Sequence, residues 1–151
     1  MSAPADIRFI STAETMPLRC AILRPNRPPE SAQFPGDNEP TTRHLGAFRD
    51  GNIVGIASLY AAEFKERPGV SAYQLRGMAT APEVRGERFG WELVLSCIRF
   101  ARENEADILW CNARTGAVGF YRKLGFETIG DEFEYPDVGP HFRMWRAVAE
   151  D

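Results

Sequence analysis

The sequence feature that most constrains the fold is a change from strand periodicity to helix periodicity on either side of Pro82. Residues 72–79 alternate as in a β-strand, and the proline that follows prevents simple continuation of that strand. From about Arg88 to Glu103, apolar residues recur at helical spacing instead, with a polar stripe opposite. The apolar stripe contains Gly90, Val94, Cys97 and Ala101. We therefore predict a strand, a glycine-containing turn and a long amphipathic helix, in that order.

The other patterns predict an α/β protein in which a mixed sheet carries helices on both faces. Asp50-Gly51-Asn52 joins two alternating segments, which is typical of a β-hairpin. A helix is expected from about Ala13 to Leu23 with Thr12 as its N-cap, followed by a long proline-rich loop from Arg24 to Thr42. The remaining expected segments are strands at Asp6–Ile10, Arg43–Arg49, Ile53–Tyr60, Ile108–Cys111, Phe126–Ile129 and His141–Val148, and a short helix at Ala117–Leu124.

Composition narrows the class of protein. A chain of 151 residues with 44% hydrophobic and 26% charged residues is typical of a single globular domain, here residues 1–151. A net charge of −3 argues against binding to nucleic acid. No apolar run could span a membrane, and the first residues do not resemble a secretory signal, so the expected compartment is the cytoplasm. The widely spaced Cys20, Cys97 and Cys111 predict neither disulfides nor a metal site.

The turn before the long helix is a candidate anion-binding site. The first amides of a helix have no partner within the helix, and the positive end of the helix dipole lies behind them. Arg85 and Arg88 add positive charge, while Gly86 and Gly90 allow a ligand to approach closely. An ordinary strand-to-helix turn with incidental arginines is the alternative interpretation. A diphosphate is the anion that this arrangement would suit.

Two motifs resemble those of the GNAT superfamily of acyl-CoA-dependent N-acetyltransferases, in its bacterial branch. Arg85–Gly90 resembles the Gln/Arg-x-x-Gly-x-Gly/Ala pyrophosphate loop of that family, with Arg88 in place of the central glycine. Ala117–Phe126 resembles the Ala-x-x-Phe-Tyr-x-Lys-x-Gly-Phe run that follows its fifth strand. The resemblance covers about Arg43 to Val148. It implies a GNAT-like fold, with a mostly antiparallel sheet that is splayed between its fourth and fifth strands.

The resemblance also implies a reaction and its residues. Acetyl-CoA would be the co-substrate, and its pantetheine arm would pair with the backbone of Met78 and Ala79. The N–H of Ala79 would polarise the thioester carbonyl, and Tyr121 would be the general acid that protonates the departing thiolate. The residues expected to bind the cofactor are Met78, Ala79, Thr80, Arg85, Gly86, Glu87, Arg88, Phe89, Gly90, Trp91, Asn112, Ala117, Phe120 and Tyr121.

The sequence defines the group that deprotonates the acceptor amine less well. His44 is the preferred candidate for this general base, with His141, Asp37 and Glu63 as alternatives. Asp37 and Glu39, both in the long loop, could instead attract a cationic substrate. The expected acceptor is a small-molecule or peptide amine. Neither nucleic acid nor a membrane is an expected partner, and a homodimer is compatible with the sequence.

Two other functions remain open from the sequence. The same fold could bind acyl-CoA as a sensor without transferring the acyl group, which the substitution of Arg88 for the loop glycine leaves open. Alternatively, Cys111 could act with His44 or His141 as a cysteine hydrolase, although Cys111 lies in a buried strand pattern that gives no sign of a lowered thiol pKa.

Overall fold

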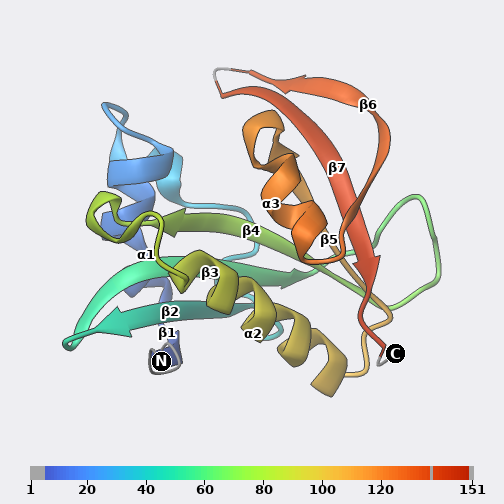
Figure 1. Cartoon of the computed structure of the whole chain (residues 1–151), viewed down its shortest axis with the longest axis horizontal. Helices are drawn as coiled ribbons and strands as arrows, with labels where there is room; N and C mark the ends of the chain where they lie inside the picture. Colours follow the sequence, from blue (N-terminus) through green and yellow to red (C-terminus); the bar gives the residue numbers. More distant parts are fainter. Residues whose placement is uncertain (1–5, 137, 150–151) are drawn as a thin grey trace. The chain divides into compact units, whose positions relative to one another are not determined.

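The computed structural model describes residues 6–136 and 138–149, and Figure 1 labels its helices and strands. In chain order the elements are β1 (Asp6–Ile10), α1 (Thr12–Leu18), the π-helical η1 (Arg19–Leu23), the 3₁₀ helix η2 (Pro29–Ala32), β2 (Arg43–Arg49), β3 (Asn52–Ala61), β4 (Ala72–Thr80), the 3₁₀ helix η3 (Pro82–Val84), α2 (Phe89–Glu103), β5 (Ile108–Arg114), the 3₁₀ helix η4 (Thr115–Ala117), α3 (Val118–Lys123), β6 (Glu127–Tyr135) and β7 (Gly139–Ala147). No helix in the described ranges is long and apolar enough to cross a membrane.

The strands form one seven-stranded sheet in the order β1-β2-β3-β4-β5-β7-β6. β4 and β5 are parallel, whereas the pairs β1–β2, β2–β3, β5–β7 and β6–β7 are antiparallel. The predicted mixed, mostly antiparallel sheet is therefore confirmed. The register between β4 and β5 ends at Leu75↔Cys111. β4 and β5 thus pair only over Ala72–Leu75 and Ile108–Cys111, as expected for two strands that splay apart beyond this point.

The chain divides into two compact units. The first comprises Met1–Tyr60 and Arg76–Cys97, and the second comprises Ala61–Leu75 and Ile98–Asp151. Each unit is therefore built from two separate stretches of sequence, and the boundaries fall inside β4 and α2. The organisation of residues 1–151 as a single domain stays a prediction.

In the first unit, the hairpin between β2 and β3 forms as predicted. Arg49 pairs with Asn52, which leaves Asp50 and Gly51 as a two-residue loop. Both have positive φ angles, 52° and 81°. Asp-Gly suits this conformation because glycine has no Cβ and aspartate tolerates left-handed backbone better than most residues.

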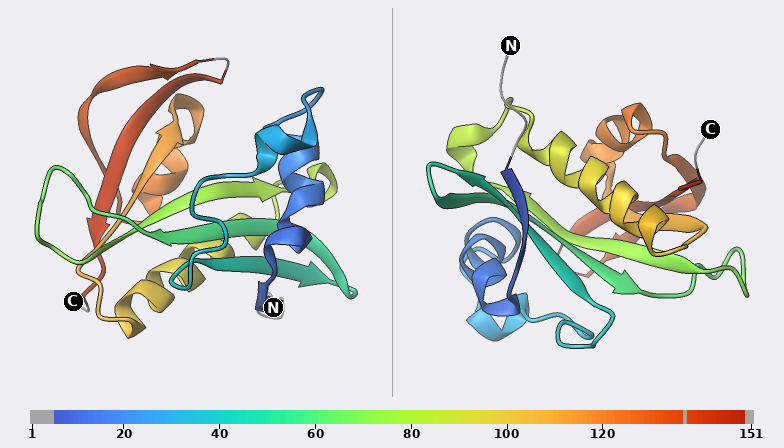
Figure 2. Two further views of the ribbon diagram at one scale, coloured as in Figure 1. Left: turned by 180° about the vertical axis from the view of Figure 1, so that it is seen from behind. Right: turned by 90° about the horizontal axis from the view of Figure 1, so that it is seen from below.

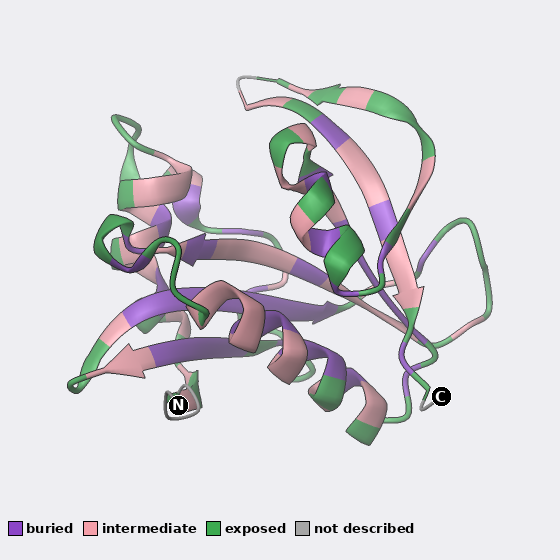
Figure 3. Ribbon diagram, viewed as in Figure 1, coloured by how far each residue is buried: buried purple, intermediate pink, exposed green. Residues whose placement is uncertain are grey.

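Helices cover both faces of β3 in this unit, which confirms another expectation (Figure 2). A Cβ on Gly55 would lie 2.9 Å from a side-chain atom of Leu93 in α2, so the absence of a side chain lets that helix approach closely. Ser58 and Tyr60, which alternate with Gly55 along the strand, contact Arg19 of η1 instead. β3 is accordingly buried along most of its length (Figure 3).

The first helix differs from the prediction at its start. Ser11, and not Thr12, is the N-cap: its hydroxyl accepts a hydrogen bond from the N–H of Glu14 at 3.1 Å, and the Glu14 carboxylate accepts one from the N–H of Ser11 at 2.8 Å. This reciprocal capping box satisfies two amides that the helix leaves free. Thr12 is the first helical residue, and the predicted end at Leu23 is reached through the π-helical turn η1.

In the second unit, β5, β7 and β6 form an antiparallel ribbon that is longer than the sequence predicted. β5 continues past Cys111 to Arg114, and β6 runs past Ile129 to Tyr135. The register of β6 with β7 shifts between Ile129 and Phe133, where Gly130 has a φ of 78°. The bulge carries exposed acidic residues that interrupt the apolar alternation, and for this reason the sequence predicted that the strand ends at Ile129.

Candidate active site

The turn between β4 and α2 is anchored by its apolar residues. The N–H of Ala81 donates to the carbonyl of Val54 on β3 at 2.8 Å. Ala81 and Val84 are buried with Val54 in one hydrophobic cluster, against which Leu18 and Phe89 pack. The 3₁₀ turn η3 thus holds one side of the connection in the core and leaves the other side in solvent.

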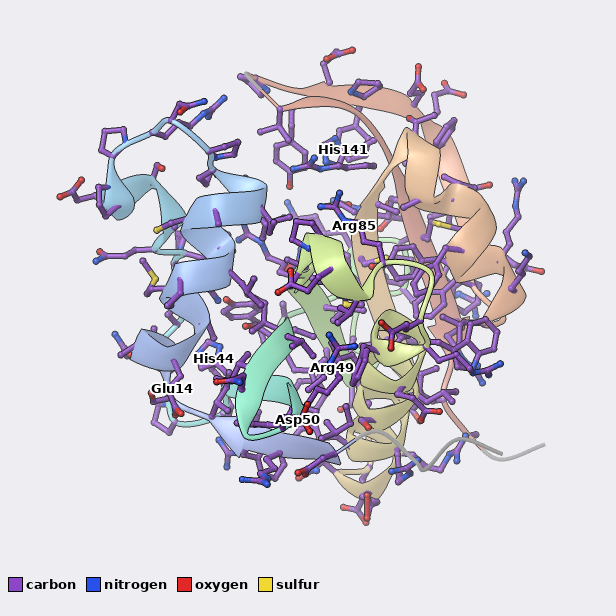
Figure 4. The ribbon with its side chains drawn as sticks, turned by 60° about the vertical axis from the view of Figure 1, so that its left-hand side comes forward. Glu14, His44, Arg49, Asp50, Arg85 and His141 are labelled. Carbon is purple, nitrogen blue, oxygen red and sulfur yellow. The ribbon has the colours of Figure 1, made fainter. Side chains whose placement is uncertain are left out.

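The exposed side of the turn carries Arg85, Gly86, Glu87 and Arg88. Gly86 has a φ of 87°, and no atom of the residues that the structure describes lies within 4 Å of where its Cβ would be, so the space beside its backbone is open to those residues. The Glu87 carboxylate pairs with the guanidinium of Arg49 at 2.9 Å, which offsets its negative charge. Figure 4 labels Arg49 and Arg85. The turn therefore presents cationic side chains around an accessible stretch of backbone.

The first backbone N–H groups of helix α2 have no acceptor within the helix. Its first hydrogen bond between residues four apart joins the N–H of Glu92 to the carbonyl of Arg88 at 2.9 Å. The amides of Phe89 and Gly90 come before this bond and have no carbonyl one turn back within the helix. Together with the helix dipole and the neighbouring arginines, these amides have the arrangement expected of an anion site. That this turn binds an anion stays a prediction.

β4 leads into this turn and contains a residue with left-handed backbone. Gly77 has a φ of 64°, and a Cβ there would lie 3.3 Å from the ring of Phe34 and 3.4 Å from Nε of Arg19. Ala79 is buried, whereas Met78 and Thr80 are partly exposed. Gly77 is thus needed both for its backbone conformation and for the close approach of Phe34.

The structure shows His44, the preferred base candidate, within a buried polar network of the first unit (Figure 4). Its Nε2 lies 3.0 Å from the carbonyl oxygen of Asp37, and its Nδ1 lies 2.6 Å from the hydroxyl of Ser58. Because a carbonyl can only accept, Nε2 carries the proton in the neutral ring and Nδ1 accepts from Ser58. Both nitrogens of His44 are therefore engaged. Its role as a base stays a prediction.

At the centre of this network is an ion pair that the sequence analysis missed. The Arg19 side chain is 0% exposed, and it binds the Asp37 carboxylate in bidentate fashion at 2.8 and 3.0 Å. Its second amino group also donates to Ser58 at 3.0 Å and to Tyr60 at 3.1 Å. The sequence does contain a signal for this ion pair, because Arg19 is a charged residue within the apolar run from Met16 to Leu23.

The network fixes the protonation state of its acidic groups. Burial alone would raise the pKa of Asp37, but hydrogen bonds from Arg19, Tyr60 and the N–H of Phe34 hold the pKa below its ordinary value. Burial and the hydrogen bond to Asp37 raise the pKa of Tyr60 to about 12. Asp37 is therefore an ionised structural partner of Arg19, and its carboxylate is not directed to a cationic substrate from solvent.

In the second unit, Asn112 near the end of β5 is held in one orientation. Its amide nitrogen donates to the Tyr135 hydroxyl at 3.1 Å, and its oxygen accepts from Nε of Arg143 at 3.1 Å. Arg143 also pairs with Glu66 at 3.2 Å. These contacts fix the side chain of a residue predicted to border the cofactor.

His141 lies opposite Arg114 in the register of β5 with β7. Its Nδ1 lies 2.8 Å from the carbonyl oxygen of Gly139, to which it must donate. The neutral ring therefore has its lone pair on Nε2, which has no hydrogen-bond partner in the part of the chain that the structure describes. Among those residues, Nε of Arg19 is the only buried side-chain nitrogen or oxygen that is inaccessible to solvent and has no hydrogen-bond partner. Because Nε2 of His141 also has no partner, it must keep some access to solvent.

Tyr121 lies on the short helix α3 and is 6% exposed. Its ring packs edge-on against Phe120 and Phe126, with centroids 5.2 and 5.4 Å apart. Ala117 ends η4 just before this helix and is partly exposed. The aromatic contacts fix the ring of Tyr121. Its role as general acid stays a prediction.

The predicted site residues thus fall into two groups. Those from Met78 to Trp91, together with His44 and Asp37, belong to the first unit, whereas Asn112, Ala117, Phe120, Tyr121, His141 and Glu63 belong to the second. Glu63 is exposed. Cys111 is buried, and this burial raises the pKa of its thiol far above the ordinary value. A thiolate nucleophile at this position is therefore strongly disfavoured.

Known proteins share both the sequence and the fold. The sequence profile of the Acetyltransferase (GNAT) family matches residues 12–126. The chain is 34% identical over 143 residues to the Uncharacterized N-acetyltransferase YitI of Bacillus subtilis, a match that covers 95% of this chain and 96% of that protein. Escherichia coli ElaA has the same fold, with a TM-score of 0.77 at 18% identity over 94% of this chain and 99% of that one.

A second solved structure is that of an aminoglycoside 6′-N-acetyltransferase complexed with coenzyme A. Its TM-score is 0.74 at 13% identity, over 97% of this chain and 98% of that one. At this identity the likeness concerns the fold. The profile match and the similarity to YitI place this chain in the GNAT family of N-acetyltransferases, whose members use acyl-CoA to acetylate amines.

Proposed function

We propose that this enzyme transfers an acetyl group from acetyl-CoA directly to a primary amine. The observation that carries the proposal is the turn between β4 and α2, where the first amides of the helix, open space beside Gly86 and two arginines suit a diphosphate. Acetyl-CoA would supply the activated acetyl group as its thioester. The rest of the chemistry belongs to the side chains and backbone of this chain.

Backbone and side chains have separate roles in the proposed reaction. The N–H of Ala79 donates to the thioester oxygen, where negative charge develops when the amine nitrogen bonds to the acetyl carbon. Tyr121 donates its phenolic proton to the sulfur as the carbon–sulfur bond breaks. A base takes the proton that the amine nitrogen loses.

For that base, the geometry favours His141 over His44. His44 uses both ring nitrogens within its own network. His141 fixes one nitrogen on Gly139 and keeps a lone pair on the other. A base needs such a lone pair within reach of the substrate proton, so we propose His141 for this role.

A first experiment separates transfer from mere binding. Thiol release is followed with acetyl-CoA and a panel of amines, while calorimetry measures binding of coenzyme A. Turnover supports the enzyme, whereas tight binding without turnover on any amine supports the acyl-CoA sensor. Arg85→Ala should weaken binding of coenzyme A by about tenfold, as expected for loss of a charge-assisted hydrogen bond. Arg99→Ala, at an exposed position further along α2, is the matched control.

The role of Tyr121 is tested by removing its hydroxyl. Tyr121→Phe should lower kcat by about a hundredfold or more and leave the affinity for acetyl-CoA near its original value. Tyr73→Phe is the matched control, because Tyr73 also packs edge-on against a phenylalanine, with centroids 5.6 Å apart. An unchanged kcat in Tyr121→Phe would remove Tyr121 from the mechanism.

A further inference from the structure

The long loop from residue 24 to residue 42 meets β4 through the ring of Phe34. This ring is buried, and it lies against Gly77, where a Cβ would be only 3.3 Å away. The N–H of Phe34 donates to Asp37 at 2.8 Å, so the network around Arg19 also fixes the position of the ring. Phe34 is therefore a rigid part of the unit and lies against Gly77, the residue that precedes Met78 on β4.

Arginine side chains surround this ring. The guanidinium carbons of Arg19, Arg76 and Arg24 lie 4.2, 4.5 and 5.4 Å from its centroid. Cations are attracted to the face of an aromatic ring, so the contacts orient the guanidinium groups. The contacts do not neutralise the charges, because the ring carries no net charge of its own.

Of these arginines, Arg19 has its own carboxylate, which Asp37 supplies. Arg76 differs. It is partly buried, and within residues 6–136 and 138–149 its side chain makes neither an ion pair nor a hydrogen bond, only its contact with Phe34. Removing a cation from part of its water without a counter-ion costs free energy. The guanidinium of Arg76 is thus a partly desolvated positive charge for which the described residues supply no counter-ion.

Arg8 provides a comparison, because it makes the same ring contact together with a carboxylate. The Arg8 guanidinium carbon also lies 4.5 Å from a phenylalanine centroid, that of Phe48. Arg8 is nevertheless paired with the carboxylate of Asp6. The same ring contact therefore occurs with a carboxylate partner at Arg8 and without one at Arg76. Among the described residues, Arg67 and Arg88 also lie over aromatic rings without an ion pair, but both are exposed, whereas Arg76 is partly buried.

Arg76 is also poorly placed for the diphosphate. Between Arg76 and Thr80, β4 rises by about 13 Å at ordinary strand spacing, and the turn with Arg85 follows only after η3. Arg76 instead directly precedes Gly77 and Met78, at the part of the strand where the thioester is proposed to lie. Its charge is therefore available to the acceptor and not to the far end of the cofactor.

We propose that the acceptor is a small amine that also carries a carboxylate or a phosphate, and that Arg76 binds this anionic group beside Phe34. The inference rests on the proposed acetyltransferase function. The planar guanidinium fork can donate two parallel hydrogen bonds to either oxyanion. Selectivity follows because an amine without the oxyanion leaves the charge of Arg76 uncompensated.

The test compares matched acceptors on the same enzyme. Thiol release from acetyl-CoA is measured with ω-amino acids of increasing chain length, with the matching ω-amino amides, and with phosphoethanolamine. For at least one chain length, kcat/KM for the acid should exceed that for its amide by about tenfold or more, as expected for a charge-assisted contact. Phosphoethanolamine then shows whether the site takes a phosphate as well as a carboxylate.

Variants of Arg76 show whether this residue causes the preference. Arg76→Gln should bring the acid-to-amide ratio of kcat/KM close to one, and Arg76→Lys should restore it in part. Both substrates are measured on one preparation, so a partial folding defect cancels from the ratio. Arg8→Gln is the matched control and should keep the ratio of the unmodified enzyme.

The outcomes distinguish failure of the inference about Arg76 from failure of the proposed acetyltransferase function. Equal kcat/KM values for every acid and its amide, turnover only on amines without an oxyanion, or an unchanged ratio in Arg76→Gln would overturn the inference and leave the acetyltransferase standing. Absence of turnover across the panel by protein that binds coenzyme A would overturn it as well. If coenzyme A fails to bind and no amine is acetylated, the proposed function itself is contradicted.

Discussion

His44 and His141 are both buried histidines on strands, and they differ in how completely their surroundings use their polar atoms. His44 lies in a closed ring of hydrogen bonds in which Arg19 donates to Ser58, Ser58 donates to His44, and His44 donates to the carbonyl of Asp37. The ring closes because Asp37 also binds Arg19 through its carboxylate. No nitrogen of His44 is left over for a substrate.

The surroundings of His141 are mostly aromatic. Phe133 is stacked on its ring at a centroid distance of 6.0 Å, and Tyr135 meets it edge-on at 4.7 Å. One hydrogen bond to Gly139 sets the tautomer. Aromatic packing thus fixes the ring without consuming its second nitrogen. The comparison teaches that depth of burial does not distinguish these two histidines, whereas the number of engaged nitrogens does.

The largest effect is expected from breaking the ion pair of the His44 network. Asp37→Asn leaves the buried guanidinium of Arg19 without its counter-charge, which should lower the free energy of unfolding by about 3–5 kcal/mol. Denaturant titration measures the change. Asp6→Asn, in the exposed pair with Arg8, is the control and should leave stability unchanged. Similar results for the two variants would show that the buried network contributes little.

The next effect concerns His141 and should appear in the kinetics. His141→Gln keeps a polar side chain of similar reach but removes the basic lone pair, so kcat should fall by about a hundredfold or more. The free energy of unfolding should change little, because within the described part of the chain only one hydrogen bond involves the ring. Added imidazole should restore part of the activity if the lone pair is what was lost. An unchanged kcat would return the role of base to the other candidates.

His44→Gln should show the opposite behaviour. Glutamine cannot reach Ser58 and the carbonyl of Asp37 with the geometry of the ring, so buried polar groups lose partners and stability should fall by about 1–3 kcal/mol. The kcat of the remaining folded enzyme should stay near its original value. Active-site titration during the assay separates these two quantities. A selective loss of kcat at full stability would instead support His44 as the base.

The smallest effect is the acid dependence of stability. Because the folded pKa of Asp37 lies below its ordinary value, its pairing stabilises the fold fully above the unfolded pKa of about 3.9. That stabilisation is lost as the pH falls toward the folded pKa, by at most about 1.4 kcal/mol per pH unit for one proton. Unfolding measured from pH 6 down to pH 2 should show the decline, and Asp37→Asn should remove this part of it.

Sequence alone could predict the elements whose causes are local. The hairpin at Asp50-Gly51 and the strand-to-helix change at Pro82 depend on neighbouring residues, and both are confirmed. The N-cap is a local feature that was assigned wrongly, because Ser11 and Glu14 already show capping-box spacing in the sequence. The far half of β6 was missed because Asp131 and Glu132 are exposed on a strand with little apolar alternation.

The polar networks could not be predicted in the same way. Arg19 and Asp37 are joined across a helix and a long loop, and no spacing rule relates two such positions. The turn between β4 and α2 could be predicted because it follows from a continuous motif, Arg85–Gly90. The functional ranking of His44 and His141 depends on which nitrogens are engaged, and that is decided by contacts distant in sequence.

The attachment of the long loop at Phe34 and Asp37 has a consequence for engineering. Residues 25–31 precede the tethered part and are mostly exposed, so they could be exchanged or lengthened while the anchoring contacts are retained. A graft that replaced residues 34–37 would instead remove the clamp on Arg19 and the ring that orients Arg76. Libraries aimed at new acceptors should therefore diversify the first half of the loop and keep Phe34 and Asp37 constant.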